Sequence, residues 1–140
     1  MVYVGVDGCP SGWFAVISGE GPPTANQYSS IDELWEANKQ ASRILIDIPI
    51  GLPSTDRRTC DIKAKQQLGC RGSSVFYTPS RSVLNVSSHE EMNRVNKRET
   101  SHGVSAQTHA LMPKIKEVDE FLRRRPDAGK VLVESHPELC

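Results

Sequence analysis

The stretch "RILIDIPIGLP" (residues 43–53) constrains the fold more than any other part of the sequence. Its near-continuous Ile and Leu content, closed by two prolines, predicts a strand buried on both faces, as in a parallel or central strand. A helix is predicted before it, because Ser30 and Glu33 form a capping box and the helical pattern continues to about Ser42. That helix supplies the crossover that a parallel pairing with earlier strands requires.

The first thirty residues predict an antiparallel hairpin. Residues 1–7 and 13–18 are alternating apolar runs, and the short turn "CPSG" joins them. Two strands connected by so short a link pair antiparallel. Residues 25–29 predict a weaker third strand.

The remainder of the chain predicts mainly helices. A short helix over 61–68 ends at Gly69, and a polar helix follows the capping box that begins at Ser88. A longer helix is predicted over 105–125, in which Pro113 marks a kink or the first turn. The residues "GKVLVESHPE" predict a last strand. One face of the longer helix would carry Leu111, Ile115, Val118 and Leu122.

This order of elements predicts an α/β fold with an RNase H-like mixed sheet. The first strands would be antiparallel and the later ones parallel, with a helical insertion over about 51–129 between the fourth and fifth strands. The fold has a further helix after its last strand, and nothing before Cys140 corresponds to it. We therefore expect residues 1–140 to be a single, C-terminally truncated domain without its closing helix. A sheet left bare in this way would favour a homodimer.

Composition narrows the class of protein. The 17 basic and 17 acidic side chains give no overall attraction to nucleic acid or membrane. Acids predominate up to Ile50, whereas residues 57–81 hold six Lys or Arg and one acid. This asymmetry is consistent with a cation site beside a phosphate-binding surface. The alternative is that the charged residues only keep the surface soluble. The four cysteines contain no C-x-x-C pair, and no signal peptide or membrane-length apolar run is present. We expect a cytoplasmic protein with free thiols and no membrane partner.

Three predicted strands end in an acid: Asp7, Asp47 and Glu134. Ligands of open α/β sheets gather at the carboxyl ends of the strands, where adjacent strands lie about 4.8 Å apart. These three carboxylates are therefore candidate catalytic residues and candidate ligands of Mg²⁺ or Mn²⁺, with Glu138 as a fourth ligand. The alternative is that each acid forms a turn or caps a helix.

The basic segment suggests contacts to a substrate. Arg58, Arg71 and Ser73 offer guanidinium and hydroxyl donors suited to phosphates. The alternative is a solvated surface. His136 is a candidate acid or base, or a turn residue.

Five motifs carry a resemblance to a known family: "VGVDGCPSGW", "IDIPIGLP", "RRTCDIKAKQQLGCRGSSVF", "GVSAQTHALMPKIKEVDEFL" and "VESHPE". In this order they resemble domain-of-unknown-function family 429, described as predicted nucleases with an RNase H-like fold. The resemblance implies that Asp7, Asp47, Glu134 and Glu138 are the family's acidic positions. Its insertion motifs include Arg58, Arg71, Ser74 and Lys114, which we count as substrate-binding candidates. Family members continue past "ESHPE" into a helix that carries further aspartates.

The leading hypothesis is a nuclease or phosphodiesterase that cleaves DNA, RNA or a related phosphodiester with Mg²⁺ or Mn²⁺. A non-catalytic binding or assembly module is the alternative, favoured by the missing helix. A phosphotransferase of the actin-like or sugar-kinase type is a third hypothesis, weakened by the lack of a second Gly-rich phosphate loop.

Overall fold

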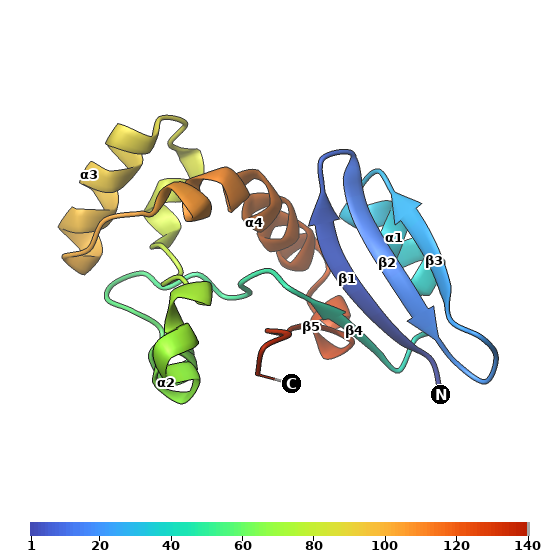
Figure 1. Cartoon of the computed structure of the whole chain (residues 1–140). Coiled ribbons are helices and arrows are strands. Elements are labelled where there is room, and N and C mark those ends of the chain that lie inside the picture. The colour runs from blue at the N-terminus through green and yellow to red at the C-terminus, as the bar shows by residue number, and fades with distance from the viewer. Residues whose placement is uncertain (140) are drawn as a thin grey trace. The chain divides into compact units, whose positions relative to one another are not determined.

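A computed structural model describes residues 1–139 and contains one five-stranded mixed sheet (Figure 1). Its strands are β1 (Tyr3–Cys9), β2 (Gly12–Ser18), β3 (Thr24–Tyr28), β4 (Arg43–Ile46) and β5 (Leu132–Glu134). The strand order is β3-β2-β1-β4-β5. β1–β2 and β2–β3 pair antiparallel, and β1–β4 and β4–β5 pair parallel. The predicted α/β class and the RNase H-like sheet topology are confirmed.

Most of the helical residues lie between β4 and β5 in the sequence, as predicted. No helix within residues 1–139 has both the length and the apolar character needed to cross a membrane. The α-helices are α1 (Ile31–Asn38), α2 (Thr59–Leu68), α3 (His89–Thr100) and α4 (Ala106–Arg124), and 3₁₀ helices span Gly69–Ser74, Arg81–Asn85 and Pro126–Lys130.

The chain forms two compact units. The sheet unit comprises residues 1–50 and 114–138, and the helical unit comprises residues 51–113. The boundary falls inside α4, directly after Pro113. Pro113 therefore lies within a continuous helix and not at its first turn.

Two serines cap helices at the predicted places. Ser30 Oγ accepts the Glu33 N–H at 3.1 Å, and Ser88 Oγ accepts the Glu91 N–H at 3.2 Å. The Glu33 carboxylate reaches Ser29, accepting from its N–H at 2.8 Å and its hydroxyl at 2.7 Å. The reciprocal bond thus falls one residue earlier than in the usual capping box.

The covered face of the sheet packs against α1 and the second half of α4. Ile115, Val118 and Phe121 of α4 are fully buried, and the Phe121 ring lies 6.0 Å from that of Trp35 in α1. The sequence pattern predicted Leu122 on the buried face of this helix. Phe121 is buried there instead, and Leu122 is only half-buried. The sheet contributes Val4, Val6, Ala15, Ile44 and Ile46 to this core.

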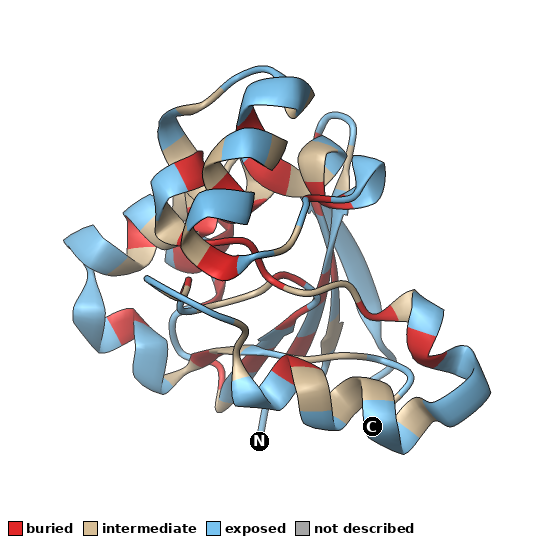
Figure 2. Ribbon diagram, turned by 90° about the vertical axis from the view of Figure 1, so that its left-hand side faces the viewer, coloured by how far each residue is buried: buried red, intermediate tan, exposed pale blue. Residues whose placement is uncertain are grey.

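The opposite face of the sheet, called the open face below, is exposed. Along β4, Ile44 and Ile46 are fully buried, but Leu45 is 38% exposed. Burial of this strand on both faces, expected from its Ile and Leu content, is therefore wrong: its parallel neighbours are present, yet helices of the sheet unit pack on one face only. Figure 2 shows exposed residues alternating with buried ones along the strands. The open face includes Tyr3, Gly5, Asp7, Phe14, Val16 and Leu45.

Candidate carboxylate site on the open face

Asp7 and Asp47 lie side by side on the parallel strand pair β1–β4. Val6 pairs with Ile46, and the Asp47 N–H donates to the Val6 carbonyl oxygen at 3.3 Å. Adjacent strands lie about 4.8 Å apart, and alternate residues share a face. The two aspartates therefore project together from the open face, so the structure brings these two predicted site residues into one place.

Three charged side chains act electrostatically on Asp47. Loss of hydration raises the pKa of its carboxyl above the usual value of 3.8. The charge of His136 opposes this shift, and the negative charges of Asp7 and Glu134 add to it. The charges of Asp7 and Glu134 thus both disfavour the ionised form of Asp47, and a cation beside Asp7 and Asp47 would relieve this repulsion.

The Glu134 side chain does not lie on the open face with Asp7 and Asp47. It pairs with Ile46, whose side chain is buried on the covered face, so Glu134 alternates away from the face of Asp7 and Asp47. Its carboxylate accepts the Ile50 N–H at 2.9 Å. The segment after β4 therefore orients the third predicted site residue.

Within residues 1–139, no three His, Cys, Asp or Glu side chains are grouped closely enough to form a ready-made metal site. The different face of Glu134 accounts for this. A pair of carboxylates still fits Mg²⁺, which keeps several waters and commonly takes one or two carboxylates together with substrate phosphates. Glu138, the fourth predicted ligand, is exposed beyond β5.

A groove of about 470 Å³ runs along the open face beside the two aspartates. It is mostly apolar, and its polar side chains are Asp7, Asp47 and Ser135. The groove was not predicted from the sequence, although the exposed alternation of β2 was the available signal. The groove is lined by Gly5, Val6, Asp7, Phe14, Val16, Leu45, Asp47, Ser135 and Pro137.

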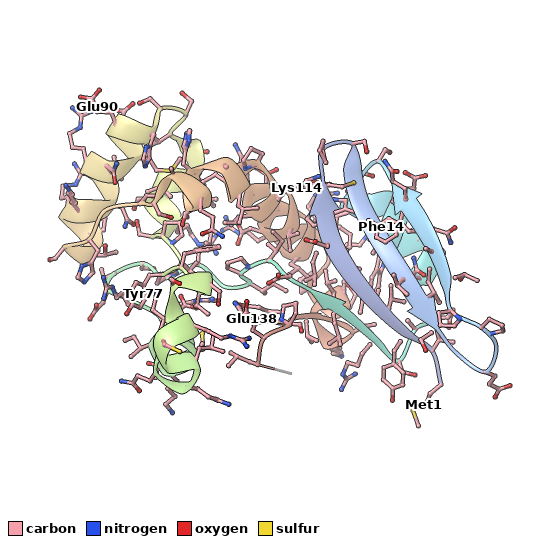
Figure 3. All side chains as sticks on the ribbon, in the orientation of Figure 1. Met1, Phe14, Tyr77, Glu90, Lys114 and Glu138 are labelled. Atoms are coloured by element: carbon pink, nitrogen blue, oxygen red, sulfur yellow. The ribbon has the colours of Figure 1, made fainter. Side chains whose placement is uncertain are left out.

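Lys114 supports the β1–β2 turn. Its ammonium donates to the Gly12 carbonyl oxygen at 2.6 Å and lies 4.5 Å from the centre of the Trp13 ring, and its stem passes over Gly8 (Figure 3). Gly12 itself is required, because its φ of +140° and the close Tyr28 carbonyl leave no room for a Cβ. This substrate-binding candidate therefore has a structural contact at the turn after Asp7.

Glu117 joins three elements of the sheet unit, a role that was not predicted from the sequence. Its Oε1 accepts the Trp13 Nε1–H at 3.1 Å and the Ile31 N–H at 2.7 Å. The second bond satisfies one of the free N–H groups at the start of α1. A lone glutamate in an amphipathic helix gives no sequence signal for this role.

In the helical unit, Arg58 forms a nearly buried ion pair with Asp61. The Arg58 Nη2 lies 2.5 Å from Asp61 Oδ1, and their side chains are 10% and 7% exposed. The Thr78 N–H also donates to Asp61, at 2.9 Å. Arg58, predicted to face phosphates, thus has a structural partner.

The other predicted substrate contacts of this unit lie in the 3₁₀ helix Gly69–Ser74. Arg71 and Ser73 are exposed, and the Ser74 hydroxyl donates to the Arg71 carbonyl oxygen at 2.9 Å. Nearby in the sequence, the Arg57 guanidinium lies 3.6 Å from the centre of the Tyr77 ring, and the Lys65 ammonium lies 5.0 Å from it. This group of two cations and an aromatic ring was also missed.

Comparison with known proteins gives one match. The model of a family described as "Protein of unknown function (DUF429)" matches residues 5–140. The match includes Asp7, Asp47 and Glu134. No curated protein and no solved structure matches the chain significantly.

Proposed function

The chain belongs to the DUF429 family, and we propose that it is a metal-dependent phosphodiesterase of the nuclease type. The observation that carries the proposal is the placement of Asp7 and Asp47 side by side on the open face of an RNase H-like sheet. Two adjacent carboxylates repel each other unless a cation or a proton lies between them.

The donor set fits Mg²⁺ or Mn²⁺, because hard carboxylate oxygens with open positions for water suit these ions. When bound, such an ion activates a water molecule and stabilises the leaving oxygen of a phosphodiester. Asp7 and Asp47 hold the ion. Glu134, on the other face of the sheet, accepts the Ile50 N–H and so holds the segment that follows Asp47.

A nucleic acid is the favoured substrate because of the helical unit. Arg71 and Ser73 are exposed there, and the cations of Arg57 and Lys65 both lie within about 5 Å of the centre of the Tyr77 ring. Cations interleaved with aromatic rings bind single-stranded nucleic acids by phosphate contacts and base stacking. Binding to DNA or RNA should then weaken as salt is raised.

Hydrolysis of end-labelled single-stranded DNA and RNA in Mn²⁺ tests the proposal. We expect cleavage by the parent chain and a loss of more than about 100-fold in Asp7→Asn and in Asp47→Asn. Glu20→Gln, in an exposed loop of the same unit, is the matched control and should cleave at the parent rate. Cleavage that survives both aspartate changes would contradict the proposal.

One observation favours a second candidate, a non-catalytic binding module. Residues 1–139 contain no ready-made cluster of three metal ligands. Metal binding that depends on Asp7 and Asp47, but without cleavage of any phosphodiester, would favour this candidate over the nuclease.

A further inference from the structure

The groove on the open face has an apolar floor that borders directly on the carboxylates. Gly5 pairs with Val16 of β2 on one side and with Leu45 of β4 on the other, so these three residues form one row across the sheet. Asp7, two residues further along β1, pairs with Phe14 and has Asp47 as its other neighbour. A ligand bound at the aspartates would therefore have an apolar surface immediately beside it.

Gly5 leaves open space in the groove at this point. A Cβ added to Gly5 would meet no atom within 4 Å, and the backbone of Gly5 does not have a positive φ. No turn or close packing requires glycine here, and glycine weakens a strand. A glycine in a strand interior often marks the close approach of a ligand, and the side chains of Val16 and Leu45 flank the open space.

Phe14 supplies an aromatic ring at the end of the groove where the carboxylates lie. Its side chain is 45% exposed on the side of β2 away from α1 (Figure 3). An aromatic ring held on a strand beside a phosphate site is a platform on which a base can stack. The volume of about 470 Å³ lies within the range of small-molecule sites.

Building on the function proposed above, we propose that this groove is a nucleobase subsite. The base lies over Gly5 against Phe14, while the adjoining phosphate reaches the cation held by Asp7 and Asp47. Among residues 1–139, the polar side chains that line the groove are those of Ser135 and the two aspartates. The subsite therefore recognises a base by its apolar faces and accepts different bases with similar affinity.

The test compares two small probes in Mn²⁺, a nucleoside 5′-monophosphate and ribose 5-phosphate, by calorimetric titration. The parent chain should bind the nucleotide at least tenfold more tightly. Gly5→Val fills the open space without straining the strand, and Phe14→Leu keeps an apolar side chain but removes the ring. Each change should abolish the preference for the nucleotide and leave Mn²⁺ binding unchanged. Tyr3→Ala, on the same face but outside the groove, is the control and should keep the preference.

Equal affinity of the parent chain for both probes would overturn the subsite, as would a preference that survives Gly5→Val. The subsite is also overturned if neither probe binds. It is overturned as well if sedimentation shows that Gly5→Val only breaks up a dimer, because the groove would then bind a second copy of the chain. Failure of the phosphodiesterase proposal is a separate result, read from Mn²⁺ binding by the parent chain and from its cleavage of end-labelled DNA and RNA.

Discussion

The Asp47 N–H donates to the carbonyl oxygen of Val6, the residue before Asp7, and this bond sets the two aspartates next to each other on the open face. Without a cation the arrangement is unfavourable. Loss of hydration and the charges of Asp7 and Glu134 raise the pKa of Asp47, although His136 opposes them. The repulsion between these carboxylates thus lowers the stability of the metal-free protein at the proposed site.

Replacing Asp47 by Asn should stabilise the metal-free chain at pH 7, by up to about 1 kcal/mol because the group is exposed and screened. Folding raises the pKa of Asp47 above 3.8, so its ionised form destabilises the native state above the folded pKa. The gain should vanish as the pH falls below 3.8, where Asp47 is protonated in both states. Thermal unfolding in the presence of a chelator measures this change in stability, with Glu20→Gln as the control variant. A lower melting temperature for Asp47→Asn at pH 7 would contradict the electrostatic description.

Removing the Glu117 carboxylate should destabilise the sheet unit. Glu117→Ala leaves the Trp13 indole N–H and the Ile31 N–H without their acceptor, at a cost of about 1–3 kcal/mol. Glu117→Gln keeps an acceptor oxygen and should lose less. Urea unfolding followed by tryptophan fluorescence gives both values. Equal losses in the two variants would show that the acceptor oxygen is not the stabilising feature.

The Arg58–Asp61 pair predicts a large effect in the helical unit. Arg58→Ala should cost about 3–5 kcal/mol, because it leaves the carboxylate of Asp61 nearly buried without its cation. Lys63→Ala, an exposed position on the same helix, should change stability by less than about 0.5 kcal/mol. Circular dichroism during thermal unfolding compares them. A neutral Arg58→Ala would instead favour the phosphate-binding role inferred from sequence.

The exposed pair of Asp32 and Arg124 should contribute little, and in a salt-dependent way. Two hydrogen bonds of 3.1 Å join the Arg124 guanidinium to the Asp32 carboxylate, and the bonding to Arg124 lowers the pKa of Asp32. Arg124→Ala should therefore lower the free energy of unfolding only slightly in low salt, and less still in about 1 M NaCl. Because the pKa is lowered, the contribution is present above 3.8 and is lost as the pH falls through the folded value. A cost that did not change between the two salt concentrations would point to packing.

Local signals were sufficient for much of the fold. The alternation of β1 and β2, the Ser30 and Ser88 caps and the helix before β4 all depend on residues close in sequence. The same reasoning placed Asp7 and Asp47 on neighbouring strands, although β1 continues two residues past Asp7 to Cys9. It could not give the exposure of Leu45, because hydrophobicity alone does not say which face of a sheet a helix covers.

The remaining features of the site depend on register and on distant partners. A shift of one residue in register moves a side chain to the other face of the sheet. Glu134 is in register with Ile46 and not with Asp47, so it does not share the face of Asp47. Likewise, the Lys114 ammonium donates to the carbonyl oxygen of Gly12, which lies over a hundred residues away in the sequence. Such contacts leave no local pattern, so a lysine or arginine in a basic segment cannot be assigned to phosphate or to structure from sequence alone.

Calorimetric titration of Mn²⁺ into the parent chain, Asp7→Asn, Asp47→Asn and Glu20→Gln tests the central claim most directly. We expect binding in the parent and in Glu20→Gln, with at least a tenfold loss of affinity in each aspartate variant while circular dichroism shows an intact fold. Absence of Mn²⁺ binding in the parent, or binding that neither aspartate change weakens, would contradict a carboxylate metal site on the open face.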